Sequence, residues 1–177
     1  MGGINQMLTG GGTRTKYGVA KVYAVALYID STGGASALKK YAGPKVPKDP
    51  KFFQALVDGQ FAKTLHLQMH RSVASEAMVT ALDEALAKRL PADVVARFRS
   101  AFLKALPSDS LAKGDQLYFM CKGGTLSMGF AAGTSAATLR DKGLCGAFFD
   151  IYLGKSPVSP TAKDAIATGF AGRGLYQ

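Results

Sequence analysis

LTGGGTRTKYGVAKVYAVALYID, residues 8–30, is the stretch that decides the fold of this chain. A glycine run at residues 10–12 leads to Arg14, and we expect these glycines to adopt backbone conformations that other residues resist. After a bend or bulge at Gly18, residues 19–30 form a strand with two apolar faces, Tyr23, Val25, Leu27 and Ile29 on one and Val22, Ala24, Ala26 and Tyr28 on the other. Such a strand is covered by protein on both faces, or by helices on one face and an apolar cavity on the other.

Length and composition indicate one globular domain, residues 1–177, with 47% hydrophobic and 19% charged residues. The 22 Lys and Arg against 12 Asp and Glu leave a formal charge of +10. Most of the basic residues are scattered, and no zinc finger, basic helix or RNA-binding aromatic signature accompanies them, so we expect no nucleic acid partner. The one concentration lies in a proline-interrupted loop, where an anionic surface or a larger protein complex is a candidate partner, and it consists of Lys39, Lys40, Lys45, Lys48 and Lys51.

The two cysteines, Cys121 and Cys145, lie in a predicted strand and a predicted helix, with no C-x-x-C spacing and no neighbouring histidine. This pattern favours two buried thiols over a disulfide. No run of about 18 apolar residues exists, so we expect no membrane-spanning segment. The opening MGGINQM has no basic flank and apolar core, which excludes a secretory signal and suits the start of a trimmed mature chain.

The remaining periodicities predict an alternation of helices and strands. Helices are expected at 35–41, from Pro50 after the capping Asp49 to 58, at 72–90, from Pro91 to 106, at 144–153 and from Pro160 onward. Strands are expected at 61–70 and 136–140, and a hairpin at 116–121 and 125–130. Hairpins without a repeated βαβ unit indicate the α+β class with an antiparallel sheet.

Several kinds of site are excluded by their spacing. Residues 10–16 lack the G-K-[ST] order of a phosphate loop. His66 and His70 are four residues apart on an extended strand, roughly 13 Å, which is too far for one metal ion. No Ser/His/Asp or Cys/His arrangement is recognisable. We expect neither a metal nor another cofactor.

Arg14 and Tyr23 are the candidates for binding. An arginine between glycines and an apolar strand presents a permanently charged fork at the mouth of a cavity, suited to a carboxylate or a phenolate. Tyr23 adds a hydroxyl for the same anion. Taken alone, however, the two residues are more typical of a surface arginine and a core tyrosine.

Four segments resemble the chalcone isomerase-like superfamily, in order and over nearly the whole chain. They are RTKYGVAKVYAVALY at 14–28, GQFAK at 59–63, LRDKGLCGAF at 139–148 and GKSPVSP at 154–160. The resemblance implies an open-faced β-sandwich, with a large antiparallel sheet, helices on one face and a ligand cleft between them. The superfamily includes isomerases that close a chalcone to a flavanone, plastid fatty-acid-binding proteins and non-catalytic relatives, so function must be argued from the site.

The resemblance also assigns roles to single residues. Arg14 matches the arginine that meets the ligand's anionic group, and Tyr23 matches the pattern of the fatty-acid binders, where isomerases have threonine. Lys63 and Cys145 match cleft positions of the isomerases, so the implied ligand-binding set is Arg14, Tyr23, Lys63 and Cys145.

The predicted helix 72–90 departs from the isomerases, which carry a tyrosine, a lysine and an asparagine facing the substrate. The nearest matches here are Glu76, Val79 and Asp83. We expect Glu76 to repel an anionic substrate and to offer no donor to its ketone.

These observations favour a non-catalytic protein that binds a fatty acid or similar amphipathic acid through an Arg/Tyr clamp. One alternative is a chalcone–flavanone isomerase, an intramolecular lyase whose catalytic residues would be Arg14, Tyr23 and Lys63. Another is a structural subunit of an organellar complex, with the cleft collapsed. The resemblance and the opening residues suggest an organelle, a plastid rather than a mitochondrion.

Overall fold

The computed structural model describes residues 5–172. A six-stranded antiparallel sheet with the order β1-β2-β3-β6-β7-β8 forms one layer, and a two-stranded sheet, β4-β5, stands beside it. The strands are β1 (Gln6–Lys16), β2 (Ala20–Asp30), β3 (Lys63–Met69), β4 (Val73–Ala74), β5 (Ser110–Leu111), β6 (Gln116–Lys122), β7 (Thr125–Gly129) and β8 (Ala137–Arg140). The helices are α1 (Gly33–Leu38), η1 (Lys39–Tyr41), α2 (Pro50–Asp58), α3 (Ser75–Ala87), α4 (Ala92–Ala105), α5 (Leu144–Leu153) and α6 (Pro160–Gly172).

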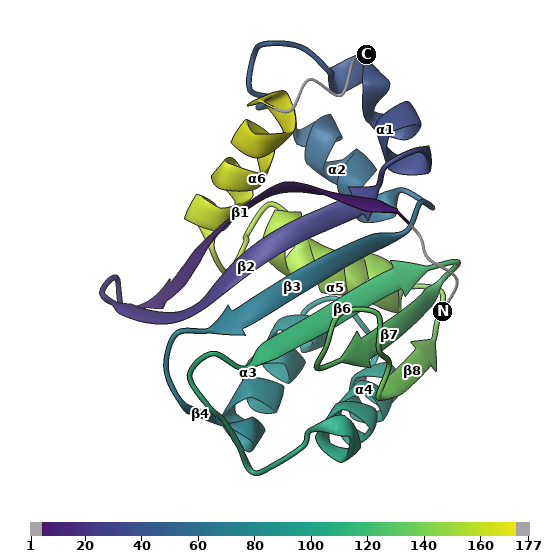
Figure 1. Ribbon diagram of the computed structural model, residues 1–177. Helices are drawn as coiled ribbons and strands as arrows, with labels where there is room; N and C mark the ends of the chain where they lie inside the picture. The colour runs from purple at the N-terminus through teal and green to yellow at the C-terminus, as the bar shows by residue number, and fades with distance from the viewer. Residues whose placement is uncertain (1–4, 173–177) are drawn as a thin grey trace.

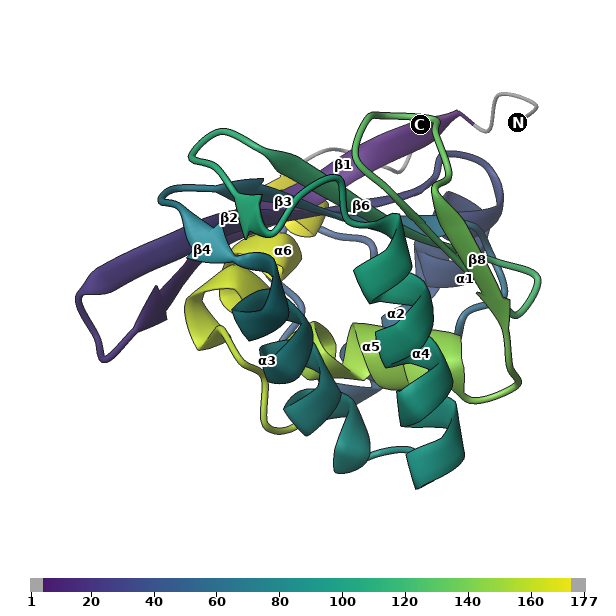
Figure 2. The ribbon, with the colours of Figure 1, turned by 90° about the horizontal axis from the view of Figure 1, so that it is seen from below.

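The helices lie on one face of the large sheet, as the two views show (Figure 1, Figure 2). α5 runs behind the middle strands, with the α3–α4 pair on one side of it and α2 on the other (Figure 1). This arrangement confirms the predicted α+β class and the open-faced β-sandwich. Within the described residues no helix combines the length and apolar character needed to cross a membrane.

Strand β2 has one buried face and one half-open face. Tyr23, Val25, Leu27 and Ile29 are all buried against the helical layer. The opposite face, from Ala24 to Tyr28, is partly exposed. We expected the second face of this strand to be covered by protein or to line an apolar cavity, and this expectation is wrong. The alanines there are small, and Tyr28 can keep its hydroxyl in water while its ring lies on the sheet.

The glycine run of β1 serves close packing and not backbone freedom, so the predicted role is wrong. None of these glycines has a positive φ angle. A Cβ on Gly10 would lie 2.4 Å from the carbonyl oxygen of Ala165, and one on Gly12 would lie 2.7 Å from the Cα of Ala162. Helix α6 thus rests directly on the backbone of β1, with no side chain between them. Gly18 does take the turn predicted for it, with a φ of 74°.

Cys121 and Cys145 are joined by a disulfide, so the prediction of two free thiols is wrong. Their Cα atoms are 5.8 Å apart, although 24 positions separate them in the chain. Cys121 is at the end of β6 and Cys145 is in the first turn of α5, so the bond fastens the sheet to the central helix. Whether the two cysteines can form a disulfide depends on where α5 lies over the sheet, and local periodicity does not reveal this position.

The predicted helix ends are mostly confirmed. The Asp49 carboxylate accepts a hydrogen bond from the Lys51 backbone N–H at 2.8 Å and caps α2. Helix α3 begins at Ser75, three residues later than expected from the 72–90 pattern, because Val73 and Ala74 pair with β5.

Candidate functional site

A cavity of about 470 Å³ lies at one end of the sheet, under the tip of the β1–β2 hairpin. Its walls come from the two hairpin strands, the β3–β4 connection, α3 and α5. Met78, Leu82, Ile151 and Val158 line its apolar part. Three cations stand around its mouth: Arg14, Lys16 and Arg71. No carboxylate is among the described residues that line it, so the cavity suits an apolar molecule with an anionic end.

The pairing of β1 with β2 places Arg14 directly opposite Tyr23. Because directly opposed residues of antiparallel strands share a face, both side chains lie on the helix-facing side of the sheet. A register shift follows between Arg14 and Thr15, which leaves Val22 as the extra residue of a bulge. Val22 and Tyr23 are consecutive and yet both line the cavity, the re-aiming effect that bulges have beside binding sites.

Tyr23 is hydrogen-bonded to a second tyrosine. Its hydroxyl oxygen lies 3.0 Å from that of Tyr152, which α5 brings up from below. Burial raises the pKa of Tyr23, although the hydrogen bond to Tyr152 and the charge of Arg14 act to lower it. Burial also raises the pKa of Tyr152 well above 10, with Tyr23 adding to the effect. Both hydroxyls are therefore neutral donors at pH 7.

Arg14 has donors to spare for a ligand. One guanidinium N–H group is hydrogen-bonded to the backbone carbonyl of Thr15, and a guanidinium has five N–H donors in all. Within residues 5–172, no ion pair is formed by Arg14 or by the other two cations at the mouth. The site can thus offer the charged guanidinium of Arg14. It can also offer one hydroxyl donor, because the hydrogen bond between Tyr23 and Tyr152 uses only one of their two O–H protons.

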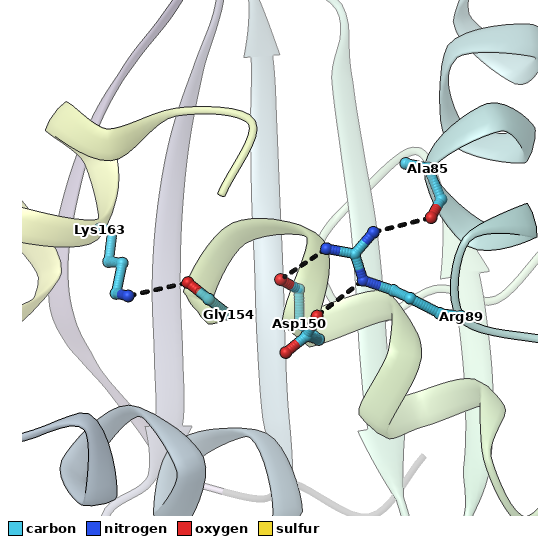
Figure 3. Close-up of polar contacts among 5 residues, drawn as sticks. All are labelled: Ala85, Arg89, Asp150, Gly154 and Lys163. Atoms are coloured by element: carbon cyan, nitrogen blue, oxygen red, sulfur yellow. Dashed lines mark hydrogen bonds and ion pairs between the residues drawn. The ribbon is translucent and has the colours of Figure 1, made fainter. Parts of the chain in front are cut away.

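Helix α5, which carries Tyr152, is fixed at its C-terminal end by two cations (Figure 3). Arg89 Nε donates to the Asp150 carboxylate at 2.7 Å, and Arg89 Nη1 donates to the Ala85 carbonyl at 2.8 Å. Lys163 Nζ donates to the Gly154 carbonyl at 2.8 Å. These contacts connect α3, α5 and α6 around the cavity and hold Tyr152 beneath Tyr23.

The α3 wall of the cavity is apolar, which corrects the expectation that Glu76 faces a ligand. The lining residues of α3 include Ala77, Met78 and Ala81. Glu76 is ion-paired with Arg99 on α4, and the Asp83 carboxylate accepts from the same guanidinium at 2.5 Å. Helical periodicity turns these two acids toward α4, and Val79 is fully buried.

Lys63 lies away from the cavity of Arg14 and Tyr23. Its pairing partner in β2 is Ile29, six positions along the strand from Tyr23, a distance of roughly 20 Å. Its ammonium donates to the carbonyls of Leu56, Val57 and Gly59 at 2.7, 2.5 and 2.9 Å, and so caps the C-terminal end of α2. Burial lowers the pKa of Lys63 to about 8.

Cys145 is also outside that cavity. It lines a separate cavity of about 300 Å³ together with Lys63 and Cys121. Its sulfur is bonded to Cys121 and carries no thiol proton for a ligand. Of the four residues assigned by resemblance, the structure thus brings Arg14 and Tyr23 together at one end of β2, and Lys63 and Cys145 together at the other end.

Other predicted features have simple structural positions. The five lysines of the proline-interrupted loop are all exposed. His66 is hydrogen-bonded to Gln116 and stacked on Tyr118 on the outer face of the sheet. Within residues 5–172 no group of three metal-ligating side chains occurs.

Sequence reasoning missed Tyr152, Lys16 and Arg71. Tyr152 belongs to the apolar stripe of the predicted helix 144–153, and nothing in that stripe distinguishes its hydroxyl from a core residue. Lys16 was detectable in principle, because it follows Arg14 by two positions and so shares its strand face. Arg71 lies beyond the end of β3, where a side chain's direction depends on the loop.

Comparison with known proteins agrees with this geometry. Residues 1–166 match the chalcone isomerase-like protein family. A chalcone–flavanone isomerase of Oryza sativa subsp. japonica is 27% identical over 164 residues, which cover 83% of this chain and 70% of the isomerase. A crystal structure of a fatty-acid-binding protein of Arabidopsis thaliana superposes with a TM-score of 0.79 at 19% identity, covering 98% of this chain and 91% of the other, which shows a shared fold. The chain therefore belongs to the chalcone isomerase-like family.

Proposed function

We propose that this protein binds a fatty acid, or a similar single-chain amphipathic acid, in the 470 Å³ cavity. The observation that carries the proposal is the convergence of Arg14, Tyr23 and Tyr152 at one place on the wall of an otherwise apolar cavity. The carboxylate accepts from the Arg14 guanidinium and from the tyrosine hydroxyl that the pair leaves free. Charge-assisted hydrogen bonds of this kind are about twice as strong as neutral ones.

The apolar wall receives the chain of the ligand. Met78 and Leu82 of α3 and Ile151 of α5 line the cavity, and each methylene buried there gains about 0.8 kcal/mol. The presence of open space beneath the hairpin supports a binding protein over a subunit with a collapsed cleft. The fold shared with a fatty-acid-binding protein supports the same choice.

The test is a titration of the delipidated protein with laurate, preceded by native mass spectrometry of the protein as purified. We expect an acid to co-purify and Arg14→Gln to weaken laurate binding by about tenfold to a hundredfold. Arg140→Gln is the matched control, because Arg140 is exposed on β8 at the far edge of the sheet. If no acid co-purifies and Arg14→Gln binds laurate as tightly as the wild type, the proposal is wrong.

A second candidate is a chalcone-isomerase-type intramolecular lyase, favoured by the rice relative and by Arg14, which could orient a phenolate for ring closure. The α3 wall weakens this candidate, because Ala77, Met78 and Ala81 offer no donor to a substrate ketone. Spectrophotometric loss of a chalcone decides between them. A rate equal to the spontaneous one, with intact laurate binding, excludes the lyase and leaves the binder.

A further inference from the structure

The tip of the β1–β2 hairpin exposes two large apolar side chains. Tyr17 is 86% exposed and Val19 is 83% exposed. The only other exposed large apolar residue in the described part of the chain is Val46, at 38%. A single exposed apolar residue is ordinary, but these two stand together at a turn that projects beyond the rest of the sheet (Figure 1, Figure 2).

The same tip is basic. Residues 14–23, which form the turn and its flanks, contain Arg14, Lys16 and Lys21 and no acidic residue. Arg71, from the β3–β4 connection, lines the cavity mouth beside Lys16 and Tyr17. The Lys16 ammonium lies 5.2 Å from the centre of the Tyr17 ring. Aromatic and aliphatic side chains surrounded by cations are complementary to a surface in which an anionic layer covers an apolar interior.

We propose that this tip docks on the surface of an anionic lipid bilayer. Tyr17 and Val19 enter the boundary between head groups and acyl chains, where a tyrosine can bury its ring and keep its hydroxyl hydrated. Lys16, Lys21 and Arg71 lie against the anionic head groups. The docking stands on the tip alone, and its use for ligand transfer rests on the proposed function.

The position of the cavity relates the proposed docking to the entry of a ligand. Lys16 and Tyr17 belong both to the tip and to the lining of the 470 Å³ cavity. A docked tip therefore holds the cavity mouth at the level of the head groups. An acyl chain could then move between bilayer and cavity without exposing its whole length to water.

The test uses the absence of tryptophan from the chain. Tyr17→Trp places a single fluorophore at the tip, and Val46→Trp places one in the lysine-rich loop 39–51, the other basic surface, as the control that separates docking by the tip from docking by that loop. With vesicles of phosphatidylcholine and phosphatidylglycerol, we expect the emission of the Tyr17→Trp protein to shift to shorter wavelength. Pure phosphatidylcholine vesicles should give a much smaller shift, and the Val46→Trp protein should give none.

Vesicle sedimentation without a fluorophore provides the second measurement. Tyr17→Asn with Val19→Thr removes both apolar groups, keeps a residue suited to the positive φ of 54° at position 17 and should lower vesicle affinity about tenfold. Lys16→Gln with Lys21→Gln should lower it about twenty-five-fold, since each of the two cations near the surface contributes about fivefold. Val46→Thr should leave it unchanged.

Three results would overturn the docking: an unchanged emission at position 17 with anionic vesicles, an equal shift at position 46, or equal binding to neutral vesicles. Laurate titrations of the same proteins in the absence of vesicles keep the two proposals separate. Laurate binding without vesicle binding removes the docking alone, and vesicle binding without laurate binding removes the proposed function alone.

Discussion

Tyr23 is the residue on which the candidate site depends most. It stands opposite Arg14 in the sheet and shares a hydrogen bond of 3.0 Å with Tyr152 in the helical layer. It therefore connects the charged and the neutral donors of the site. Its strand position and its place near Arg14 could be predicted from residues 14–28, whereas its contact with Tyr152 could not, because 129 positions separate the two tyrosines.

Tyr23→Phe should weaken laurate binding about fivefold to tenfold, because the site loses a neutral donor beside the guanidinium. It should also lower the free energy of unfolding by about 1–3 kcal/mol, since the buried hydroxyl of Tyr152 is left without its partner. Isothermal titration and urea denaturation measure the two effects. Tyr118→Phe is the control, because Tyr118 lies on the outer face and its hydroxyl is hydrogen-bonded to Gln116. Equal laurate affinities for the two variants would contradict the role of Tyr23.

Lys63→Met should lower the free energy of unfolding by about 2–4 kcal/mol at pH 7, because three carbonyls at the end of α2 lose their donor. It should leave laurate affinity unchanged, since the residue lies far from Arg14. Equilibrium denaturation and laurate titration check these statements. A variant that folds as stably as the wild type but loses laurate binding would restore the ligand role suggested by resemblance.

The pH dependence of Lys63 has a definite sign. The pKa of Lys63 is about 8 in the folded protein and 10.5 in an unfolded chain, so between these values the unfolded chain holds more protons. The residue therefore stabilises the folded state increasingly as pH rises from about 8 to 10.5. The difference in unfolding free energy between wild type and Lys63→Met should be larger at pH 10 than at pH 7. A difference that shrinks would contradict the lowered pKa.

At the scale of single elements, the contact between α6 and β1 shows what local patterns leave out. The sequence predicts the helix, because Ser159 and Pro160 give its start a local signature, but it assigns unusual backbone conformations to the glycine run that lies inside β1. It does not predict that the glycines face the helix. Gly10 and Gly12 alternate with Gly11 along β1, and only the placement of α6 shows that they permit close approach.

Gly12→Ala should lower the free energy of unfolding by about 1–3 kcal/mol, the cost typical of overpacking, because the new methyl meets the backbone of α6 at Ala162. Gly146→Ala is the control, since a Cβ there meets nothing within 4 Å and alanine favours a helix by about 1 kcal/mol. Thermal or urea denaturation distinguishes the two substitutions. If both had the same effect, close packing between α6 and β1 would not explain the glycine run.

At the scale of the whole molecule, the disulfide fixes how the two layers meet. It connects β6 with the first turn of α5, the helix that carries Tyr152. The sequence predicted the strand and the helix that hold the cysteines, and it predicted the sheet and the layer of helices. It did not predict the bond, because the choice between thiols and a disulfide depends on a distance between layers and not on spacing along the chain.

Cys121→Ala with Cys145→Ala should lower the free energy of unfolding by about 3 kcal/mol, the loss expected from reopening a loop of this size in the unfolded chain. Thiol titration of the denatured, unreduced wild-type protein should find no free thiol, since these are the only cysteines in the sequence. The cysteines are far from Arg14, so the alanine variant should still bind laurate. Two titratable thiols would contradict the bond.

The cavity has walls from segments that are distant in the chain: the β1–β2 hairpin, α3, α5 and Val158 before α6. The acid that we propose as ligand would lie between these segments and contact several of them at once. Because such a ligand would bind only the folded chain, it would raise the free energy of unfolding. The increase would be about 2.7 kcal/mol when the ligand concentration is a hundredfold above its dissociation constant. Under the proposed function, filled and empty molecules of the same sequence would therefore differ in thermodynamic stability, and a partly filled preparation would be a mixture of two folded species.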